Sequence, residues 1–461
     1  MSYGCEVSVV NLTNHHITLD VSLVDPNNWE NSTTTPTQFN GGPPVEKNSS
    51  REIHVEMANG QSSGKFVITF NVDTVGTVQT LADVYPVIEG GNRKGYLMTT
   101  GGYAANKFWV LEAQYPKQSW DKYSYDWRHL SLIVLPKIDP RNWMSRLDDN
   151  ARLNDCTIPG THDTGTAAIV GGYDRLSGSR VCQGLSISEQ LNIGIRFLDI
   201  RLNKSRNWEI MHEGSSTGLF FVNDCLRPIM DFLGENSKET VLLCIKDEHG
   251  TTDGFHDGIL EMLNKAAPSY TFTGHVPPKL SELRGKVVLL RRYWIDPNTN
   301  THKVDDPDSG IDLTDFWDGP SKGGNHYDWP PNSDTFHDVP GGKVFFNYPG
   351  NLPFAIQDWY DIHDSYLATK MDLVKNYIDA AKNPQQLPDA WFINFSSCCT
   401  TTRNGFPKDF AVGEENMNDF LFLYAITRGK GRYGIIPMDF AGNPPEEATV
   451  NLLINSNWLK E

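Results

Sequence analysis

The chain carries the stretch DCTIPGTHDTG at residues 155–165, and the interpretation of the whole sequence starts there. A short apolar piece ends at Pro159-Gly160, and a polar turn then presents His162 and Asp163. Reactive side chains often lie where a rigid strand meets an exposed loop. On its own, however, a His-Asp pair after a glycine is more often a loop feature without a chemical role. The pair gains weight only from later segments of the chain.

Two of these segments add charged side chains in a telling order. RFLDIRL at 196–202 contains Asp199 and Arg201, and IMHEG at 210–214 contains His212. Two histidines that flank an arginine suit in-line phosphoryl transfer, because one imidazole can take the proton of the attacking hydroxyl while the other protonates the leaving oxygen. The guanidinium would neutralise charge on the non-bridging phosphoryl oxygens through paired hydrogen bonds.

Composition limits the classes of protein to consider. With 461 residues the chain is too long for one ordinary core, which predicts two domains. The net charge of −17 argues against a nucleic-acid partner, and an anionic bilayer would repel the chain on average. Contact with a lipid surface must therefore use local apolar or aromatic groups. No apolar run approaches the ~18 residues of a membrane span, so no transmembrane segment is expected.

The termini and the cysteines say little about compartment. The first five residues, MSYGC, show neither a basic nor an apolar signal region, which favours a cytoplasmic or a processed chain. The seven cysteines are odd in number and show no CxxC spacing, which argues against a zinc site and against a disulfide scaffold.

Residues 1–137 are predicted to form an antiparallel β-sandwich. They are rich in Thr, Asn, Val and Gly, and apolar or alternating segments are separated by turn clusters such as NGGPP. The expected strands are 6–12, 16–24, 51–58, 65–72 and 129–136. No site motif appears there, so a structural appendage and a lipid- or partner-binding module both remain open. The linker is expected around Pro136–Pro140.

Residues 138–461 alternate between strand and helix patterns, which predicts a parallel sheet closed into a (β/α)8 barrel of the TIM type. The expected strands are 156–160, 195–202, 208–212, 240–248, 286–294, 354–360, 390–397 and 433–440. The expected helices are 187–194, 224–236, 255–267, 371–382 and 417–429. Only Asn203–Asn207 separate the second strand from the third, too few for a helical crossover, so an irregular barrel with a hairpin is expected there. A long insertion at 295–350 is predicted to lie over the barrel mouth.

Strand side chains alternate between two faces, which predicts which residues point into the barrel. Each strand contributes inward polar groups near its carboxyl end, where such barrels build active sites. These residues are Asp199, Arg201, Cys244, Lys246, Arg292, Asp358, Tyr360, Asn394, Ser396 and Asp439. Arg291 is the alternative to Arg292 for the same role in the site, but alternation along the strand places it on the opposite face. Glu248 either pairs with Lys246 or joins the site.

The segments, in this order, resemble the bacterial-type phosphatidylinositol-specific phospholipases C. That family shows GTHD, then a strand carrying D-x-R, then a strand ending in H-x-G. The resemblance continues through IKDE at 245–248, LLRRY at 289–293, QDWY at 357–360, INFSS at 393–397 and PMDF at 437–440, and it covers roughly residues 140–461. The domain at 1–137 and the insertion at 295–350 depart from the compact members of the family.

The resemblance implies roles for the catalytic residues. His162 would be the general base on the inositol 2-hydroxyl, held by Asp439. His212 would be the general acid on the diacylglycerol oxygen, assisted by Asp163. Arg201 would hold the phosphate. The products would be diacylglycerol and a 1,2-cyclic inositol phosphate, and the substrates would be phosphatidylinositol or glycosyl-phosphatidylinositol anchors.

The resemblance also implies how the substrate is held. Asp199 would steer the arginine, the hydroxyls of inositol would meet Lys246, Arg292 and Asp358, and the ring of Tyr360 would offer a stacking face. No cofactor and no metal are expected, because calcium-binding eukaryotic relatives show His-Asn and an acidic residue where this chain has His-Asp and an arginine. A monomer that touches the lipid surface peripherally is expected, and the resemblance would place it outside the cell.

Two other functions compete. A non-catalytic inositol-lipid-binding protein could use the same barrel, although binding alone does not require a base and an acid. A glycerophosphodiesterase-type barrel would use a metal and a His-Arg starting motif, which is absent from this sequence.

Overall fold

The computed structural model divides the chain into two compact units. One consists of Met1–Ile138 with Leu423–Lys430 and Trp458–Glu461, and the other of Asp139–Phe422 with Gly431–Asn457. The structure describes all residues except 1–2, 31–32, 48, 59–60, 62–63, 74, 90–91, 101–107, 114–128, 170–179, 249–252, 275–278, 294, 296–308, 314–342, 347–352, 361, 363–365, 384–388, 401–404, 414–415, 430, 443–446 and 459–461.

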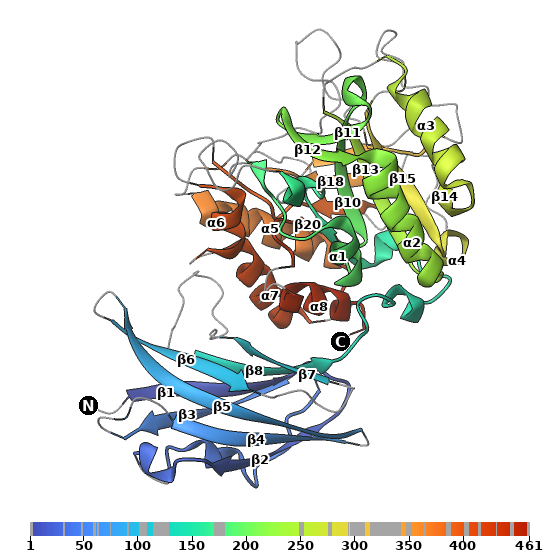
Figure 1. The fold of residues 1–461 in the computed structure, drawn as a ribbon. Helices are drawn as coiled ribbons and strands as arrows, with labels where there is room; N and C mark the ends of the chain where they lie inside the picture. Colours follow the sequence, from blue (N-terminus) through green and yellow to red (C-terminus); the bar gives the residue numbers. More distant parts are fainter. Residues whose placement is uncertain are drawn as a thin grey trace. The chain divides into compact units, whose positions relative to one another are not determined.

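The first unit contains two four-stranded sheets (Figure 1). One sheet has the order β3-β1-β8-β7 and is formed by β1 (Tyr3–Asn11), β3 (Ser49–Met57), β7 (Phe108–Ala113) and β8 (His129–Pro136). The other has the order β2-β4-β5-β6 and is formed by β2 (Ile17–Leu23), β4 (Gly64–Val72), β5 (Gly76–Glu89) and β6 (Asn92–Thr100). The five strands expected in this region are all present, and β5, β6 and β7 were not anticipated.

Alternation explains why these segments form sheets with a shared core. In β4 every second residue is buried, which places Phe66, Ile68 and Phe70 on one face. These side chains join residues of the other sheet, such as Val7 and Val55, in one hydrophobic cluster. One expectation was wrong: the unit is not purely antiparallel, because β1 and β8 pair in parallel. β8 lies between β1 and β7 in this sheet, and it pairs antiparallel only with β7.

The second unit is built on a curled, mainly parallel sheet. Its strand order is β14-β15-β13-β10-β9-β20-β19-β18-β17, and its neighbours pair in parallel except for β17 with β18. The strands are β9 (Thr157–Thr161), β10 (Phe197–Asn203), β13 (Thr240–Asp247), β14 (Thr271–Phe272), β15 (Lys286–Arg292), β17 (Lys343–Phe346), β18 (Pro353–Gln357), β19 (Trp391–Asn394) and β20 (Gly434–Met438).

The third expected strand is the exception to the parallel order. β11 (Glu209–His212) pairs antiparallel with β10, and β12 (Ser215–Phe220) pairs antiparallel with β11. The segment is therefore not one of the parallel strands of the predicted barrel. The connection that precedes it is too short to cross over the sheet, so the chain turns back as the anticipated hairpin.

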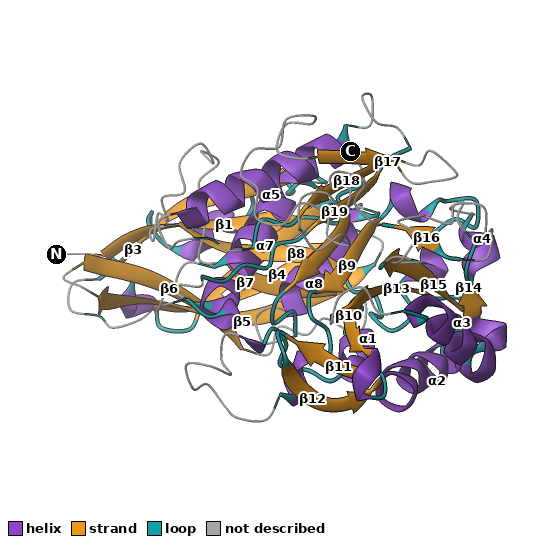
Figure 2. Cartoon of the chain, turned by 90° about the horizontal axis from the view of Figure 1, so that it is seen from above, coloured by secondary structure: helices purple, strands orange, loops and turns teal. Residues whose placement is uncertain are grey.

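Helices line the sheet of the second unit (Figure 2). They are α1 (Ile187–Asn192), α2 (Arg227–Glu235), α3 (Phe255–Ala266), α4 (Leu280–Leu283), α5 (Leu367–Lys382), α6 (Pro407–Val412), α8 (Glu447–Ser456) and the part of α7 (Met417–Arg428) up to Phe422. α5 packs on β18 and β19, α8 on β9, and α4 on β15. The five expected helices are present, while α4, α6 and α8 were not anticipated. Among the described residues, each helix is too short or too polar to cross a bilayer.

Most of the predicted insertion at 295–350 lies outside the described residues. Its described parts add strands to the sheet: β16 (Ile311–Asp312) pairs with β15, and β17 pairs antiparallel with β18. The expectation of a loop over the barrel mouth falls largely on the part that is not described.

Candidate active site

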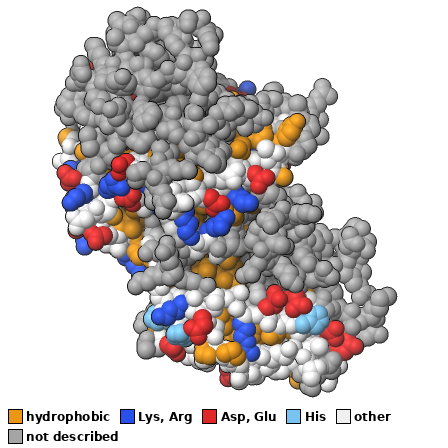
Figure 3. All heavy atoms as spheres, turned by 180° about the vertical axis from the view of Figure 1, so that it is seen from behind, with side chains coloured by type: hydrophobic (Ala, Val, Ile, Leu, Met, Phe, Trp, Pro, Cys, Tyr) orange, Lys and Arg blue, Asp and Glu red, His pale blue; other side chains and the backbone are white. Residues whose placement is uncertain are grey.

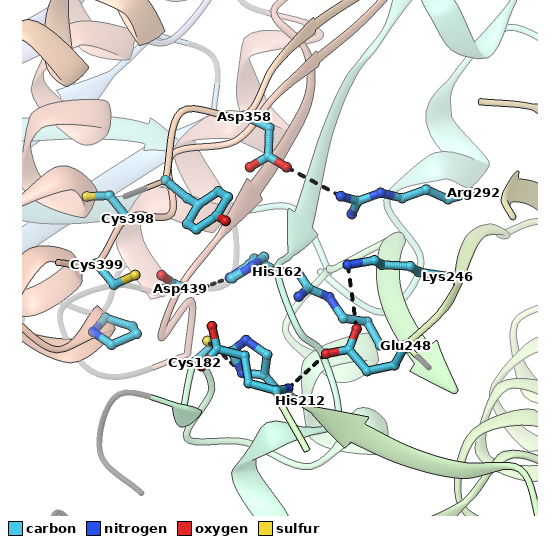
Figure 4. A pocket seen from close by; sticks show the side chains of 14 residues that line it. His162, Cys182, His212, Lys246, Glu248, Arg292, Asp358, Cys398, Cys399 and Asp439 are labelled. Carbon is cyan, nitrogen blue, oxygen red and sulfur yellow. Dashed lines mark hydrogen bonds and ion pairs between the residues drawn. The ribbon is translucent and has the colours of Figure 1, made fainter. Parts of the chain in front are cut away.

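A pocket lies at the carboxyl ends of the parallel strands (Figure 4). The family resemblance assigned roles to ten residues. Eight of these ten line the pocket: His162, Arg201, His212, Lys246, Arg292, Asp358, Tyr360 and Asp439. The remaining two, Asp163 and Asp199, are buried and pair with Arg201. The sheet therefore gathers side chains that are far apart in the sequence.

The GTHD stretch is held tightly at the centre of the sheet. β9 pairs with β20 on one side and with β10 on the other. Gly160 is opposite Phe197, and a Cβ atom on this glycine would lie only 2.9 Å from Cδ1 of that ring. The glycine thus permits the close approach of the two strands that carry the first histidine and the arginine. The backbone N–H of His162 then donates to the carbonyl of Met438, at 3.0 Å.

Backbone strain is concentrated at the site. Asp163, Glu213 and Phe440 have φ angles of 42°, 45° and 48°, in the left-handed region that non-glycine residues rarely adopt. Each of them directly follows a proposed catalytic residue, namely one of the two histidines or Asp439. Such conformations cost of order 1–3 kcal/mol each and often mark positions where a side chain must be aimed.

The first histidine has a defined tautomer. His162 Nδ1 lies 2.8 Å from Asp439 Oδ1, and its Nε2 lies 2.9 Å from Nη2 of Arg201. Since a guanidinium can only donate, Nε2 must be the accepting nitrogen, and the ring proton is on Nδ1. Burial, then the charges of Arg201 and His212, hold the pKa of His162 well below its ordinary value. This shift favours a neutral ring, with the electron pair of Nε2 directed at Arg201.

Asp163 lies between the two histidines. Its Oδ2 is 3.0 Å from Nε2 of His162 and 3.1 Å from Nε2 of His212, and its Oδ1 is 2.5 Å from Nε of Arg201. His212 donates through Nδ1 to the carbonyl of Arg180, at 2.9 Å. Burial raises the pKa of Asp163 well above the usual range, despite the arginine, and burial together with Arg201 lowers the pKa of His212. These opposite shifts favour one shared proton between the carboxyl group and the second imidazole.

Arg201 is a permanent cation fixed between carboxylates. Besides its pair with Asp163, its Nη2 lies 3.4 Å from Asp199 Oδ2, which also accepts the backbone N–H of Asp163 at 3.3 Å. Burial alone would lower the pKa of Arg201, but the two carboxylates outweigh it and leave the pKa well above the ordinary value. The guanidinium cannot lose its proton at working pH.

The opposite wall of the pocket carries paired charges. Lys246 Nζ lies 3.6 Å from Glu248 Oε2, and Arg292 Nη2 lies 3.6 Å from Asp358 Oδ2 (Figure 4). Glu248 both forms this pair and lines the pocket, and its Oε1 accepts the backbone N–H of Glu213 at 2.8 Å. These groups could exchange their mutual contacts for the hydroxyl groups of a sugar-like ligand.

Arg291, the competing arginine, points elsewhere. Its Nη2 lies 3.0 Å from Asp312 Oδ2, and its Nη1 donates to the carbonyl of Tyr293. It does not line the pocket, whereas Arg292 does. The alternation along β15 thus distinguishes the two neighbours.

Asn394 does not point into the barrel, contrary to expectation. Its Nδ2 donates to the carbonyl of Val374 in α5, and its Oδ1 accepts from Nε2 of Gln357. Gln357 is its register partner in β18, and directly opposite residues share a face of the sheet. Because Asp358 faces inward, Gln357 and its partner must face the helices. The residue beside His162 is instead Phe395, whose ring centroid is 5.9 Å away in an edge-on contact.

Some pocket residues were not anticipated as part of the site. Cys182, Cys398, Cys399 and Pro407 line the pocket. They follow no recognisable motif, and Cys182 comes from a loop rather than from a strand of the sheet. Sequence periodicity offers no signal for such residues.

Comparison with known proteins shows the family. Residues 173–293 match the family described as phosphatidylinositol-specific phospholipase C, X domain. A Listeria monocytogenes protein named 1-phosphatidylinositol phosphodiesterase is 32% identical over 347 residues, which cover 72% of this chain and 90% of that protein. The chain belongs to the phosphatidylinositol-specific phospholipase C family. The resemblance inferred from the motifs is therefore confirmed.

Other members of this phospholipase family agree in sequence and in fold. A Staphylococcus aureus protein named 1-phosphatidylinositol phosphodiesterase is 26% identical over 332 residues, covering 69% of this chain and 94% of its own length. The structure of a mutant phosphatidylinositol-specific phospholipase C from Staphylococcus aureus covers 69% of this chain and 98% of its own, with 23% identity and a TM-score of 0.56. The Listeria monocytogenes enzyme covers 69% and 99%, with 24% identity and a TM-score of 0.50.

Proposed function

We propose that this chain cleaves phosphatidylinositol to diacylglycerol and a 1,2-cyclic inositol phosphate. The observation that carries the proposal is that the Nε2 atoms of the two imidazoles have opposite hydrogen-bonding partners, a donor for one and a protonatable carboxyl group for the other. Nε2 of His162 accepts a hydrogen bond from Arg201, at 2.9 Å, while Nε2 of His212 faces the protonatable Asp163, at 3.1 Å. One ring is ready to take a proton and the other to give one, with Asp163 between them.

The first half of the reaction uses His162. Its Nε2 takes the proton of the inositol 2-hydroxyl, and the oxygen attacks phosphorus to form the new P–O bond. Asp439, 2.8 Å from Nδ1, stabilises the imidazolium that results. Arg201 would exchange its contact with the imidazole for the non-bridging phosphoryl oxygens and stabilise the charge that grows there. Asp199 keeps the guanidinium in place.

The second half uses the pair formed by Asp163 and His212. The bond from phosphorus to the diacylglycerol oxygen breaks, and Nε2 of His212 delivers the proton to that oxygen. That proton is the one shared with Asp163, which reaches Nε2 through the 3.1 Å contact before transfer and leaves Asp163 as a carboxylate. The carbonyl of Arg180 fixes the orientation of the ring through Nδ1, so that Nε2 faces the pocket.

The inositol ring would lie against the charged wall. Lys246, Arg292 and Asp358 would bind its hydroxyls, and Tyr360 would cover one face of the ring. The same phosphodiester occurs in glycosyl-phosphatidylinositol anchors, so we include them among the substrates. Release of a glycosyl-phosphatidylinositol-anchored protein from membranes by the purified chain tests that extension.

Catalysis is proposed to need no metal ion. Among the residues that the structure describes, three groups of side chains bring potential ligand atoms within 4.8 Å of one another, and one of them is His162 with Asp163 and Asp199. Arg201 contacts all three members of that group, at 2.9, 2.5 and 3.4 Å. A guanidinium therefore fills the position in which a calcium ion would need six to eight oxygen ligands.

The same proposal covers the surroundings of the site. We take the curled sheet as a TIM-type barrel, the two sheets of residues 1–137 as a β-sandwich, and the chain as a monomer that touches the bilayer peripherally. On the face shown in Figure 3, Lys, Arg, Asp and Glu side chains are interspersed among the described atoms, which does not favour binding through a basic patch. Tyr366 is 51% exposed, and its ring centroid lies 6.2 Å from that of Trp359, beside Asp358. This makes it a candidate lipid contact.

Substitution of the two histidines tests the function. His162→Ala and His212→Ala should each lower kcat for phosphatidylinositol by about 10²–10⁴-fold, since each removes one proton-transfer partner. Circular dichroism establishes that each variant is folded. His256→Ala is the matched control, because His256 is a buried histidine outside the pocket lining. Near-normal turnover in either site variant would contradict the mechanism. Binding of inositol lipid with no turnover in the wild type would instead show a binding protein.

A further inference from the structure

Cys182 is a buried thiol that the proposed chemistry does not use. Its Sγ lies 3.9 Å from Asp163 Oδ2 and 4.0 Å from His212 Nδ1. The main chain holds it in place: its N–H donates to Thr166 Oγ1 at 2.9 Å, and its carbonyl accepts from the N–H of Phe440 at 2.7 Å. The sulfur is therefore fixed against the two groups proposed to deliver the proton.

The three side chains have the donor set and spacing of a zinc site. Cys182, Asp163 and His212 each offer one ligand atom within 4.8 Å of the others. Tetrahedral Zn²⁺ has bonds of about 2.0–2.3 Å, so its ligand atoms are about 3.3–3.8 Å apart. Asp163 Oδ2 is 3.1 Å from His212 Nε2 and 3.9 Å from the sulfur, so both distances that involve the carboxylate lie close to this spacing, and the sulfur is 4.0 Å from Nδ1 of the same imidazole.

The surroundings of this group also resemble those of a ligand set. His212 donates Nδ1–H to the carbonyl of Arg180, the kind of outer contact that orients a metal-binding imidazole and leaves Nε2 for the ion. A second group, His162 with Cys182 and Asp439, includes the same sulfur. Cys182 thus belongs to two of the three groups. The third group is His162 with Asp163 and Asp199, and Arg201 contacts each of its members.

We propose that Cys182, Asp163 and His212 bind a thiophilic divalent cation such as Zn²⁺ or Cd²⁺, and that this ion inhibits the enzyme. The inhibitory role rests on the function proposed above, whereas the binding does not. A bound ion would occupy Nε2 of His212 and Oδ2 of Asp163, so the leaving oxygen would lose its proton donor. The thiol and the Asp163–His212 pair would each release a proton to solvent as the bonds to the metal form. The site should prefer soft ions because its sulfur ligand, Cys182, binds as a thiolate. Ca²⁺ and Mg²⁺ bind thiolates poorly.

The test begins with binding of Cd²⁺ alone, in the absence of substrate. Ultraviolet absorption of the cadmium–thiolate bond is recorded during titration of the full chain, together with isothermal calorimetry. Cys182→Ser should abolish this absorption and weaken binding by more than about tenfold, a loss that even outer-shell changes at metal sites produce. Cys399→Ala is the matched control, because Cys399 also lines the pocket but belongs to none of the three groups. His212→Gln should weaken binding as well, which keeps the test decisive if Cys182→Ser does not fold.

Inhibition is then measured with phosphatidylinositol vesicles and Zn²⁺. In the wild type and in Cys399→Ala, turnover should fall over the same concentration range in which the ion binds. Cadmium–thiolate absorption that persists in Cys182→Ser, or that disappears in Cys399→Ala, would overturn the site. Binding at Cys182 without loss of turnover would overturn its inhibitory role. A chain that binds Cd²⁺ through Cys182 but never cleaves phosphatidylinositol would contradict the proposed function and leave the metal site standing.

Discussion

Asp439→Asn should disable the proposed general base while leaving the pocket intact. In the wild type, Asp439 Oδ1 accepts the Nδ1 proton of His162 at 2.8 Å, and both groups are buried. An amide can instead turn its N–H₂ toward Nδ1, which would move the ring proton to Nε2. There it would oppose the donating Nη2 of Arg201, 2.9 Å away. The ring would then present a donor where the reaction needs an acceptor.

The size of the effect comes from two losses. A hydrogen bond to a charged group is worth about 1.5–3 kcal/mol, which is about 10- to 150-fold in rate if it is made only in the transition state. Loss of the correct tautomer lowers the rate further, and the limit is the whole rate contribution of a general base. We therefore expect kcat to fall by about 10²–10⁴-fold. KM should change little, because Asp439 is not proposed to bind the inositol ring.

The assay is turnover of a water-soluble inositol phosphodiester, which removes any contribution from vesicle binding. Asp419→Asn is the control: it makes the same change at a half-buried carboxyl group on α7 that contacts Asn416 rather than the pocket. A folded Asp439→Asn variant that keeps more than about a tenth of the wild-type kcat would refute the reasoning.

Three further predictions concern stability, lipid contact and domain structure. Burial lowers the pKa of Lys370 from 10.5 to about 8. Between these pH values the unfolded chain binds a proton on this lysine that the folded chain does not bind. As pH rises from 8 to 10.5, the wild type should therefore gain stability relative to Lys370→Met, by at most about 3 kcal/mol. Chemical denaturation across this range would show no such gain if the lysine were charged when folded. Tyr366→Ala should reduce turnover on vesicles but not on the soluble substrate, and equal loss on both would exclude a lipid contact. Residues 138–461 alone should be soluble and cleave the soluble substrate, and failure to fold would contradict the boundary.

Much of the candidate site could be predicted because it lies on strands. Parity in β15 selected Arg292 over Arg291, and only the former lines the pocket. The same logic failed at Asn394, because the short strand β19 was given the wrong phase. Its register with Gln357 determines the face, and register is a property of two strands rather than of one sequence.

Other features had no local signal. Cys182 reaches the site through a loop, and its contacts with Asp163 and His212 depend on tertiary folding. The parallel pairing of β1 with β8 joins segments that are more than a hundred residues apart, so hydrophobic alternation can indicate the strands but not their partners. The left-handed torsions at Glu213 and Phe440 are likewise imposed by the fold, since neither residue type favours them.

The central claim is metal-free cleavage by two histidines and an arginine. Its most direct test is to incubate the full chain with phosphatidylinositol after exhaustive chelation and to follow the phosphorus products by nuclear magnetic resonance. The account predicts a 1,2-cyclic inositol phosphate at the same rate with and without EDTA. It also predicts a loss of several orders of magnitude in Arg201→Asp, which removes the permanent cation, with partial rescue by calcium. Wild-type activity abolished by EDTA and restored by calcium would contradict it.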